Sequence, residues 1–185
     1  ERSVYCLKAY LMLEDGSVYE GTARGDFKET ACEIVFNTSM TGYVEILTDP
    51  SYAGQGVVMT YPMIGNYGIS REDFESERLQ PSAFIVHELS SDPSNFRCTD
   101  TIENLLKEYN IPCISGVDTR AVVKKLRESG TMRGVLTSDI GDRERLMDVI
   151  KSFRQIDLVG SVTAKQTKVY GEKNTGAEIA LMDFG

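Results

Sequence analysis

The side chains best able to attack a substrate or carry a proton are few in this chain of 185 residues, and they are scattered. Its single histidine, His87, lies in an apolar run and is interpreted as a structural or surface residue. The carboxylates Glu14 and Asp15, like Glu75 and Glu77, lie in polar surroundings, where such groups are usually solvated. The sequence also lacks the GxxxxGK loop and the GxSxG elbow. The residue types and their positions in the sequence therefore assign no catalytic residue.

The four cysteines, Cys6, Cys32, Cys98 and Cys113, are too far apart in the sequence to form the paired motif of a zinc site. Metal sites with four protein ligands usually combine clustered cysteine and histidine, so no metal ligand is assigned. Cys32 and Cys113 sit inside apolar runs, which predicts buried thiols that act as small hydrophobic side chains. Reduced cysteines of this kind fit a cytoplasmic protein.

The most unusual segment is 36–67, in which hydroxyl-bearing residues, glycines and turn formers are interleaved with aromatic residues. Asp49 and Pro50 predict a tight turn there, because proline fixes φ and aspartate can hydrogen-bond the nearby backbone. Such a turn would present Ser51 outward, with one hydroxyl donor and two acceptor lone pairs for a small polar ligand. A purely structural loop between strands explains the same composition.

The elements that would hold this turn in place are mainly strands in the first half of the chain. β-Branched and aromatic residues form short runs bounded by Gly, Pro, Asn and Asp, which is the pattern of strands. A hairpin is predicted where the first run ends at Glu14-Asp15-Gly16. The predicted strands are 9–13, 18–24, 31–38, 56–61 and 83–89.

The second half alternates helices with strands. Apolar residues at helical spacing predict one helix over 102–109, a second over 119–129 and a third around 146–153, with strands at 111–117 and 133–138 between them. Asp100 with Glu103 is predicted to cap the first helix and Asp118 the second, while Gly130 suits a left-handed exit. The segment 157–163 is interpreted as rich in turns.

Strands first and helices later, joined by short connections, predict an α+β or mixed β/β/α domain, although local patterns cannot fix the strand order. The predicted domain covers 1–163, followed by a polar linker over 164–177. An apolar run at 178–185 is interpreted as the first strand of another domain.

Charge and hydropathy narrow the classes of partner. The net charge of -8 opposes loose binding to nucleic acid or to an anionic membrane, because phosphates repel an acidic surface. No run approaches the ~18–20 apolar residues that a membrane span needs, and the first residues lack the pattern of a secretory signal. A cytoplasmic location without membrane or nucleic-acid partners is expected.

Several motifs follow one another along the chain. They are 13–16, Phe36-Asn37-Thr38-Ser39-Met40-Thr41-Gly42-Tyr43, 45–52, 61–62, 64–68, Ser94-Asn95-Phe96-Arg97, 117–120, 126–127, Gly130, 157–159 and 180–185. In the same order, they closely resemble the motifs of the small subunit of glutamine-dependent carbamoyl-phosphate synthetase. The resemblance spans nearly the whole chain, and its longest motif is far more specific than a lone short pattern.

The resemblance implies a small subunit of two domains, of which this chain carries the first, a swivelling β/β/α domain. The second would be a class I glutamine amidotransferase domain with a Cys-His-Glu triad, beginning with the strand at 178–185. The nucleophilic cysteine should then lie downstream, because no cysteine here sits in the family's nucleophile motif. The chain alone is expected to be inactive, although the complete protein would belong to a ligase.

In this family the small subunit hydrolyses glutamine and passes ammonia through a tunnel to a large subunit, or to a fused synthetase region. The large subunit uses ATP, Mg and bicarbonate to make carbamoyl phosphate for arginine and pyrimidine synthesis, so no cofactor is expected in this domain. Ser51 resembles the serine that contacts bound glutamine across the domain boundary. The implied partners are the large subunit, the amidotransferase domain and glutamine.

Two alternatives from other functional classes stay open at the level of sequence. One is a stand-alone small-molecule-binding or partner-docking module that reuses the same fold. The other is a hydrolase that uses the hydroxyls of Thr38, Ser39 and Thr41, which lacks a credible base.

Overall fold

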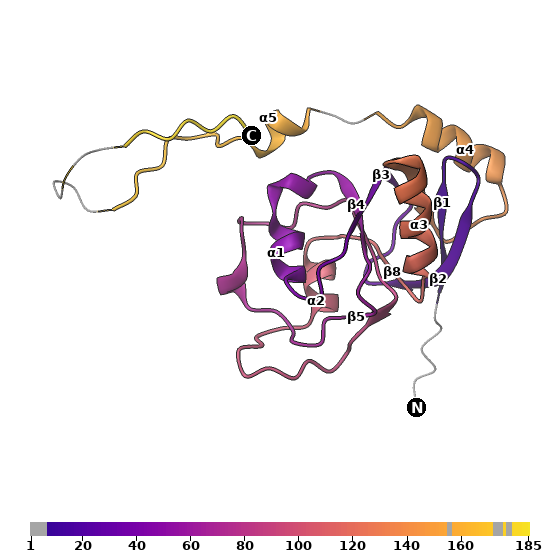
Figure 1. Cartoon of the computed structure of the whole chain (residues 1–185), viewed down its shortest axis with the longest axis horizontal. Coiled ribbons are helices and arrows are strands. Elements are labelled where there is room, and N and C mark those ends of the chain that lie inside the picture. The colour runs from indigo at the N-terminus through magenta and orange to yellow at the C-terminus, as the bar shows by residue number, and fades with distance from the viewer. Residues whose placement is uncertain (1–6, 155–156, 172–175, 177–178) are drawn as a thin grey trace. The chain divides into compact units, whose positions relative to one another are not determined.

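The computed structural model describes residues 7–154, 157–171, 176 and 179–185, and the chain forms two compact units (Figure 1). One unit spans Glu1–Gln155 and the other Ile156–Gly185; we call them the barrel unit and the C-terminal unit. Each is described by itself. In the described part of the chain, every helix is too short or too polar to traverse a lipid bilayer.

Seven strands of the barrel unit close into a barrel, and two short strands form a separate sheet. The barrel order is β1-β2-β8-β6-β4-β3-β9. The run from β3 through β4 and β6 to β8 is parallel, whereas β1, β2 and β9 join their neighbours in antiparallel pairs. The barrel strands are β1 Lys8–Leu13, β2 Val18–Arg24, β3 Thr30–Asn37, β4 Gln55–Met59, β6 Ala83–Ile85, β8 Cys113–Ser115 and β9 Met132–Thr137, and the separate pair is β5 Met63–Ile64 with β7 Glu88–Leu89.

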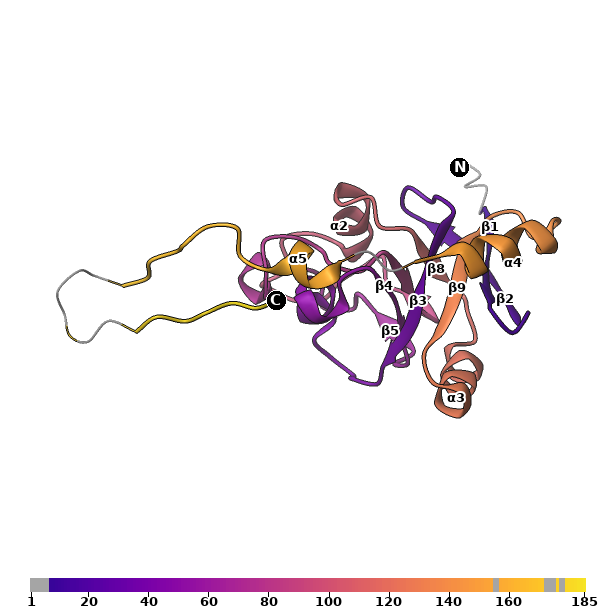
Figure 2. The ribbon, with the colours of Figure 1, turned by 90° about the horizontal axis from the view of Figure 1, so that it is seen from above.

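Helices connect the strands and cover the barrel. They are α1 Tyr43–Thr48, α2 Ile102–Glu108, α3 Thr119–Ser129 and α4 Arg143–Ser152, with single 3₁₀ turns at η1 Pro50–Tyr52 and η2 Arg71–Asp73. Helices α1 and α2 lie together beside the barrel strands (Figure 1), whereas α3 and α4 lie apart from each other and pack against different parts of the barrel (Figure 2). The mixed α/β fold expected from the sequence is confirmed.

Alternation along the strands explains why this arrangement buries apolar side chains on both faces. In β6, Ala83 and Ile85 belong to one core cluster, while Phe84 between them belongs to another. The first cluster fills the barrel and includes residues of α3, such as Leu126. The second packs α1 and α2 against the outer face of β4, β6 and β8, and a smaller third cluster joins α4 to β1 and β9. The turn that carries Ser51 is therefore attached to a wall that is packed on both faces.

Several predicted boundaries are confirmed by hydrogen bonds. The hairpin closes where Gly16 N–H donates to Leu13 O at 2.9 Å. Asp118 caps α3 by accepting from Ala121 N–H at 3.0 Å, and Gly130 ends that helix with φ of 82°, a value that favours glycine. The predicted strands at 9–13, 18–24, 31–38, 56–61, 111–117 and 133–138 each correspond to an observed strand.

Two predictions in the barrel unit were wrong in detail. The strand predicted over 83–89 is interrupted, because Val86 N–H bonds to Ile114 O whereas Glu88 and Leu89 pair with β5 in the other sheet. The cap of α2 is Thr101, which accepts from Asn104 N–H at 3.3 Å, and not Asp100 with Glu103. Both corrections depend on bonding partners that spacing alone does not reveal.

The C-terminal unit contains one turn of helix, α5 Leu158–Val162, where the sequence predicted turns. Asp157 caps it by accepting from Gly160 N–H at 2.9 Å. Residues 179–185 have no regular secondary structure here, so the predicted strand is not formed in this chain; a strand requires a neighbour to take its backbone hydrogen bonds. Positions 177 and 178 lie outside the described residues, and the division into a domain, a linker and a second domain stays a prediction.

Candidate functional site

Ser51 lies in the crossover that connects the parallel strands β3 and β4. The chain leaves β3, forms α1, turns through η1 and enters β4, and Ser51 is the middle residue of η1. Helix α1 is held to the barrel by its buried residues Tyr43, Val44 and Leu47. The sequence showed the turn but missed this helix, although Val44 and Leu47 have helical spacing. Ser51 itself is exposed, as predicted.

The Ser51 turn is stiff because its short-range hydrogen bonds are satisfied internally. Asp49 Oδ1 accepts from Ser51 N–H at 2.8 Å, which is the aspartate-capped turn expected from the sequence. Tyr52 N–H donates to Asp49 O, and Ala53 N–H donates to Pro50 O, each at 3.0 Å. Pro50 restricts φ in the same turn. The backbone of Ser51 therefore has little freedom of its own.

Asn37 connects this turn to the end of β3. Its Nδ2 donates to Tyr52 Oη at 2.9 Å, and its backbone oxygen accepts from both the N–H and the hydroxyl of Thr60 at 3.0 Å. The side-chain oxygen accepts from Ser39 N–H at 2.7 Å. The beginning and the end of the motif that spans 36–52 thus meet at one place.

A pair of stacked tyrosines braces the start of α1, and sequence reasoning did not identify it. The rings of Tyr43 and Tyr67 have centroids 4.2 Å apart. Tyr67 Oη accepts from Gly42 N–H at 2.6 Å, and Tyr43 Oη donates to Gly68 O at 2.7 Å. Burial raises the pKa of Tyr43, which keeps this hydroxyl protonated as a donor. The nearest signal in the sequence was that Tyr43 lies in the motif 36–43 and Tyr67 in the motif 64–68.

The chain around the Ser51 turn is free of charge over a long stretch. No residue from Pro50 to Ser70 is charged, although charged residues make up 26% of the chain. Exposed positions in this stretch include Ser51, Pro62 and Asn66. Depletion of charged residues is typical of the central part of a protein interface.

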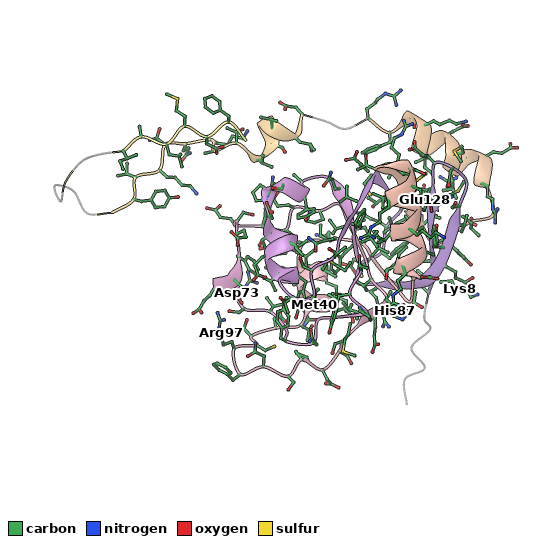
Figure 3. The ribbon with its side chains drawn as sticks, in the orientation of Figure 1. Lys8, Met40, Asp73, His87, Arg97 and Glu128 are labelled. Atoms are coloured by element: carbon green, nitrogen blue, oxygen red, sulfur yellow. The ribbon has the colours of Figure 1, made fainter. Side chains whose placement is uncertain are left out.

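The described cysteines and the histidine fit the structural roles expected of them. Cys32 and Cys113 are buried, and burial raises the pKa of each thiol to about 12, so both stay protonated and unreactive near neutral pH. Cys98 is half-buried and free, while Cys6 lies outside the described residues. His87 (labelled in Figure 3) is exposed, and its Nδ1 lies 3.0 Å from Val117 O.

Neither the hydrolase alternative nor a metal site gains support. Thr38, Ser39 and Thr41 are exposed, and no side-chain hydrogen bond joins their hydroxyls to a base within the described residues. Over those same residues, no group of three or more His, Cys, Asp and Glu could hold a metal ion. Glu14 and Asp15 have separate cationic partners, Arg133 and Lys125, rather than acting as a carboxylate pair.

An open groove of about 740 Å³ lies between the end of β2 and α2, lined by charged residues that include Arg24, Lys28 and Lys107. No residue of the Ser51 turn lines it. Ser51 is exposed and lies outside this groove, so it can supply one hydrogen-bonding group to a ligand held mainly by another surface.

Comparison with known proteins gives one consistent result. Residues 11–136 match the family described as the carbamoyl-phosphate synthase small chain, CPSase domain. The carbamoyl phosphate synthase small chain of Caldanaerobacter subterraneus subsp. tengcongensis is 47% identical over 97% of this chain and 48% of its own length. The proteins of that name from Clostridium perfringens and Archaeoglobus fulgidus are 47% and 48% identical, each over 97% of this chain and 51% of its own length.

The chain thus spans about half the length of the curated relatives it matches. Among solved structures, an aminopeptidase from Aneurinibacillus sp. strain AM-1 is similar over 70% of this chain and 30% of its own, with a TM-score of 0.41 and 16% identity. That likeness is too distant to carry an argument about fold or function.

Proposed function

Since this chain belongs to the family of carbamoyl-phosphate synthase small chains, we propose that its barrel unit helps to bind glutamine in a complete small subunit. In that role it also docks the synthetase subunit and contributes to the passage of ammonia. The product of the assembly is carbamoyl phosphate for arginine and pyrimidine synthesis. In fold terms, the barrel unit corresponds to the swivelling β/β/α domain of this family.

The observation that carries the proposal is the exposed Ser51 on a turn whose backbone is fixed by Asp49 and Pro50. A hydroxyl on a stiff support can hydrogen-bond the α-substituents of glutamine without losing much conformational entropy on binding. Ser51 would orient the substrate, and the thiol that attacks the side-chain amide would belong to the amidotransferase domain. Its contribution is positioning, with no bond made or broken at the hydroxyl.

Two of the chain's thiols support this division of labour, since Cys32 and Cys113 are buried. A cysteine nucleophile needs a lowered pKa, whereas burial raises the pKa of both Cys32 and Cys113 to about 12. We therefore assign glutamine hydrolysis to a Cys-His-Glu triad in polypeptide outside this chain. The chain alone is expected to show no glutaminase activity.

Two surfaces support contact with further protein. The exposed positions of the charge-free stretch from Pro50 to Ser70, such as Ser51, Pro62 and Asn66, suit packing against the amidotransferase domain or the large subunit. In the C-terminal unit, Ile179 and Leu181 are 92% and 93% exposed, as expected for a strand that pairs only within a second domain. We propose that these residues begin the amidotransferase domain and that the large subunit, separate or fused, is the main partner.

The cofactor requirement follows from the same assignment. ATP and Mg would be used by the large subunit, with none bound in the barrel unit. Ammonia released at the glutamine site would be protonated and lost in bulk water, so a closed passage between the two active sites preserves it. Docking of the barrel unit between amidotransferase and synthetase would help to wall that passage.

Replacing Ser51 with alanine in the complete small subunit, paired with its large subunit, tests the proposal. We expect Ser51→Ala to raise the KM for glutamine about threefold to tenfold, the effect of one lost neutral hydrogen bond, with a smaller change in kcat. The measurement is carbamoyl phosphate synthesis at varied glutamine. Synthesis supplied with free ammonia reports whether the complex is intact.

Ser39→Ala is the matched control, because Ser39 is also an exposed serine of the same crossover and its hydroxyl has no hydrogen bond within the described residues. Its KM for glutamine should equal that of the wild type. An unchanged KM in Ser51→Ala would remove Ser51 from the glutamine site. Glutaminase activity from the 185-residue chain alone would refute the assignment of the nucleophile to another domain.

A further inference from the structure

The segment 75–80, which we call the strap, contacts the chain on both sides of the Ser51 turn. Gln80 N–H donates to Leu47 O at 2.9 Å, just before the turn. Gln80 O accepts from Gly54 N–H at 3.1 Å, just after it. One residue of the strap therefore holds the two ends of the turn together, although it lies far from both in the sequence.

Thr48 joins the strap to helix α1. Its side chain is fully buried, at 0% exposure, and its Oγ1 donates to Val44 O at 2.9 Å. The same oxygen accepts from Glu75 N–H at 2.9 Å, and the backbone oxygen of Thr48 accepts from the hydroxyl of Ser76. Gln80 Nε2 donates to Ser76 Oγ at 2.8 Å, so the strap is also bonded to itself.

These contacts bear on where Ser51 points, because the turn is bonded internally and is joined to the strap at both ends. Its internal hydrogen bonds fix the backbone from Asp49 to Ala53, and the remaining freedom is the placement of the whole turn on the barrel. That placement depends on the anchors at the two ends and on the hydrogen bond from Asn37 Nδ2 to Tyr52 Oη. The buried hydroxyl of Thr48 is the anchor whose loss leaves a backbone donor, Glu75 N–H, without its partner.

We propose that Thr48 is a positioning residue for glutamine, which acts by holding the Ser51 turn against the strap. The inference rests on the proposed role of Ser51 and adds a second residue to it. Thr48 is buried, so it does not touch the substrate and its effect passes through Ser51. A displacement of about 1 Å at an orienting group is enough to weaken its contact with a substrate substantially.

The test combines Thr48→Val with Ser51→Ala in the complete small subunit paired with its large subunit. Valine keeps the volume of threonine and removes the hydroxyl. We expect Thr48→Val to raise the glutamine KM about threefold to tenfold with a smaller change in kcat, and Thr48→Ser to restore the KM to within about twofold of wild type. In the Ser51→Ala background, Thr48→Val should raise the KM by less than about twofold further, because the group it positions is already gone.

The two proposals fail in different ways. If Ser51→Ala leaves the KM unchanged, the proposed function fails. If Ser51→Ala raises the KM but Thr48→Val does not, or if the two effects multiply in full, the positioning role is overturned. Should Thr48→Val fail to fold, as thermal unfolding would show, Ser76→Ala replaces it in the same cycle, since it removes the donor to Thr48 O at a half-buried position.

Discussion

The barrel unit and the C-terminal unit contain similar apolar residues but treat them differently. In the barrel unit, strands and helices bury them in three clusters, and residues such as Leu11 and Phe84 are 0% exposed. In the C-terminal unit, no described residue is buried, and Leu181 and Phe184 are 93% and 78% exposed. The difference teaches that apolar character alone does not make a core. Apolar residues form a core only where neighbouring elements pack against them, and those elements must already have their backbone hydrogen bonds formed.

The same comparison separates two kinds of support for a functional residue. Ser51 is exposed, yet it stands on an element whose other face is packed in the barrel unit. The exposed residues of the C-terminal unit have no such packed support among the described residues. An exposed side chain on a rigid element can orient a ligand, whereas an exposed apolar side chain without support is suited to packing against another surface.

The largest expected effect comes from truncating a matched leucine in each unit of this chain. Leu11→Ala should lower the free energy of unfolding by about 2–5 kcal/mol, because it leaves a cavity in the barrel. Leu181→Ala should change it by less than about 0.5 kcal/mol. Urea unfolding followed by circular dichroism measures both. Equal losses of unfolding free energy would mean that the two leucines are packed equally well, which would contradict the difference between the two units.

An intermediate effect is expected from adding a methyl group at a glycine of each unit. A Cβ at Gly21 would lie 2.5 Å from both Ile114 Cγ2 and Ser115 O of the next strand, and a backbone atom cannot easily move aside. Gly21→Ala should therefore cost about 1–3 kcal/mol of unfolding free energy. In Gly160→Ala the new atom would meet the carboxylate of Asp157, the residue that caps α5. The urea midpoint for unfolding of the barrel unit should therefore stay at its wild-type value.

The smallest effect concerns the ion pair that attaches α4 to the barrel. Both oxygens of Glu29 accept from Arg145 at 2.8 Å, and Thr137 Oγ1 also donates to Glu29. The hydrogen bond from Arg145 is the main cause that lowers the pKa of Glu29 below its ordinary value of 4.5. A lowered folded-state pKa stabilises the protein above pH 4.5 and loses that contribution as pH falls through the folded-state value.

Glu29→Gln should accordingly lower the melting midpoint at pH 7 by about 1–3 °C, a small amount because the pair is partly exposed. The difference from wild type should shrink as the pH falls below 4.5. Melting curves between pH 7 and pH 3 test this. A difference that stays constant over that range would show that the charge on Glu29 is not what matters.

What the sequence by itself determined is local. The hairpin at 14–16, the Asp118 cap, the buried thiols of Cys32 and Cys113, and the exposed turn at Ser51 all follow from spacing, capping and turn chemistry. Each depends on interactions within a few residues or on a simple count of apolar neighbours. The family, too, was recognisable from motifs in the correct order.

Only the tertiary structure decided the closed barrel, the division of 83–89 between two sheets, the stacking of Tyr43 on Tyr67 and the strap that anchors Thr48. The physical reason is range. Periodicity reports which face of an element is apolar, but not which distant segment covers that face or takes its hydrogen bonds. The position of Ser51 is set by such distant partners, so its turn could be predicted while its support could not.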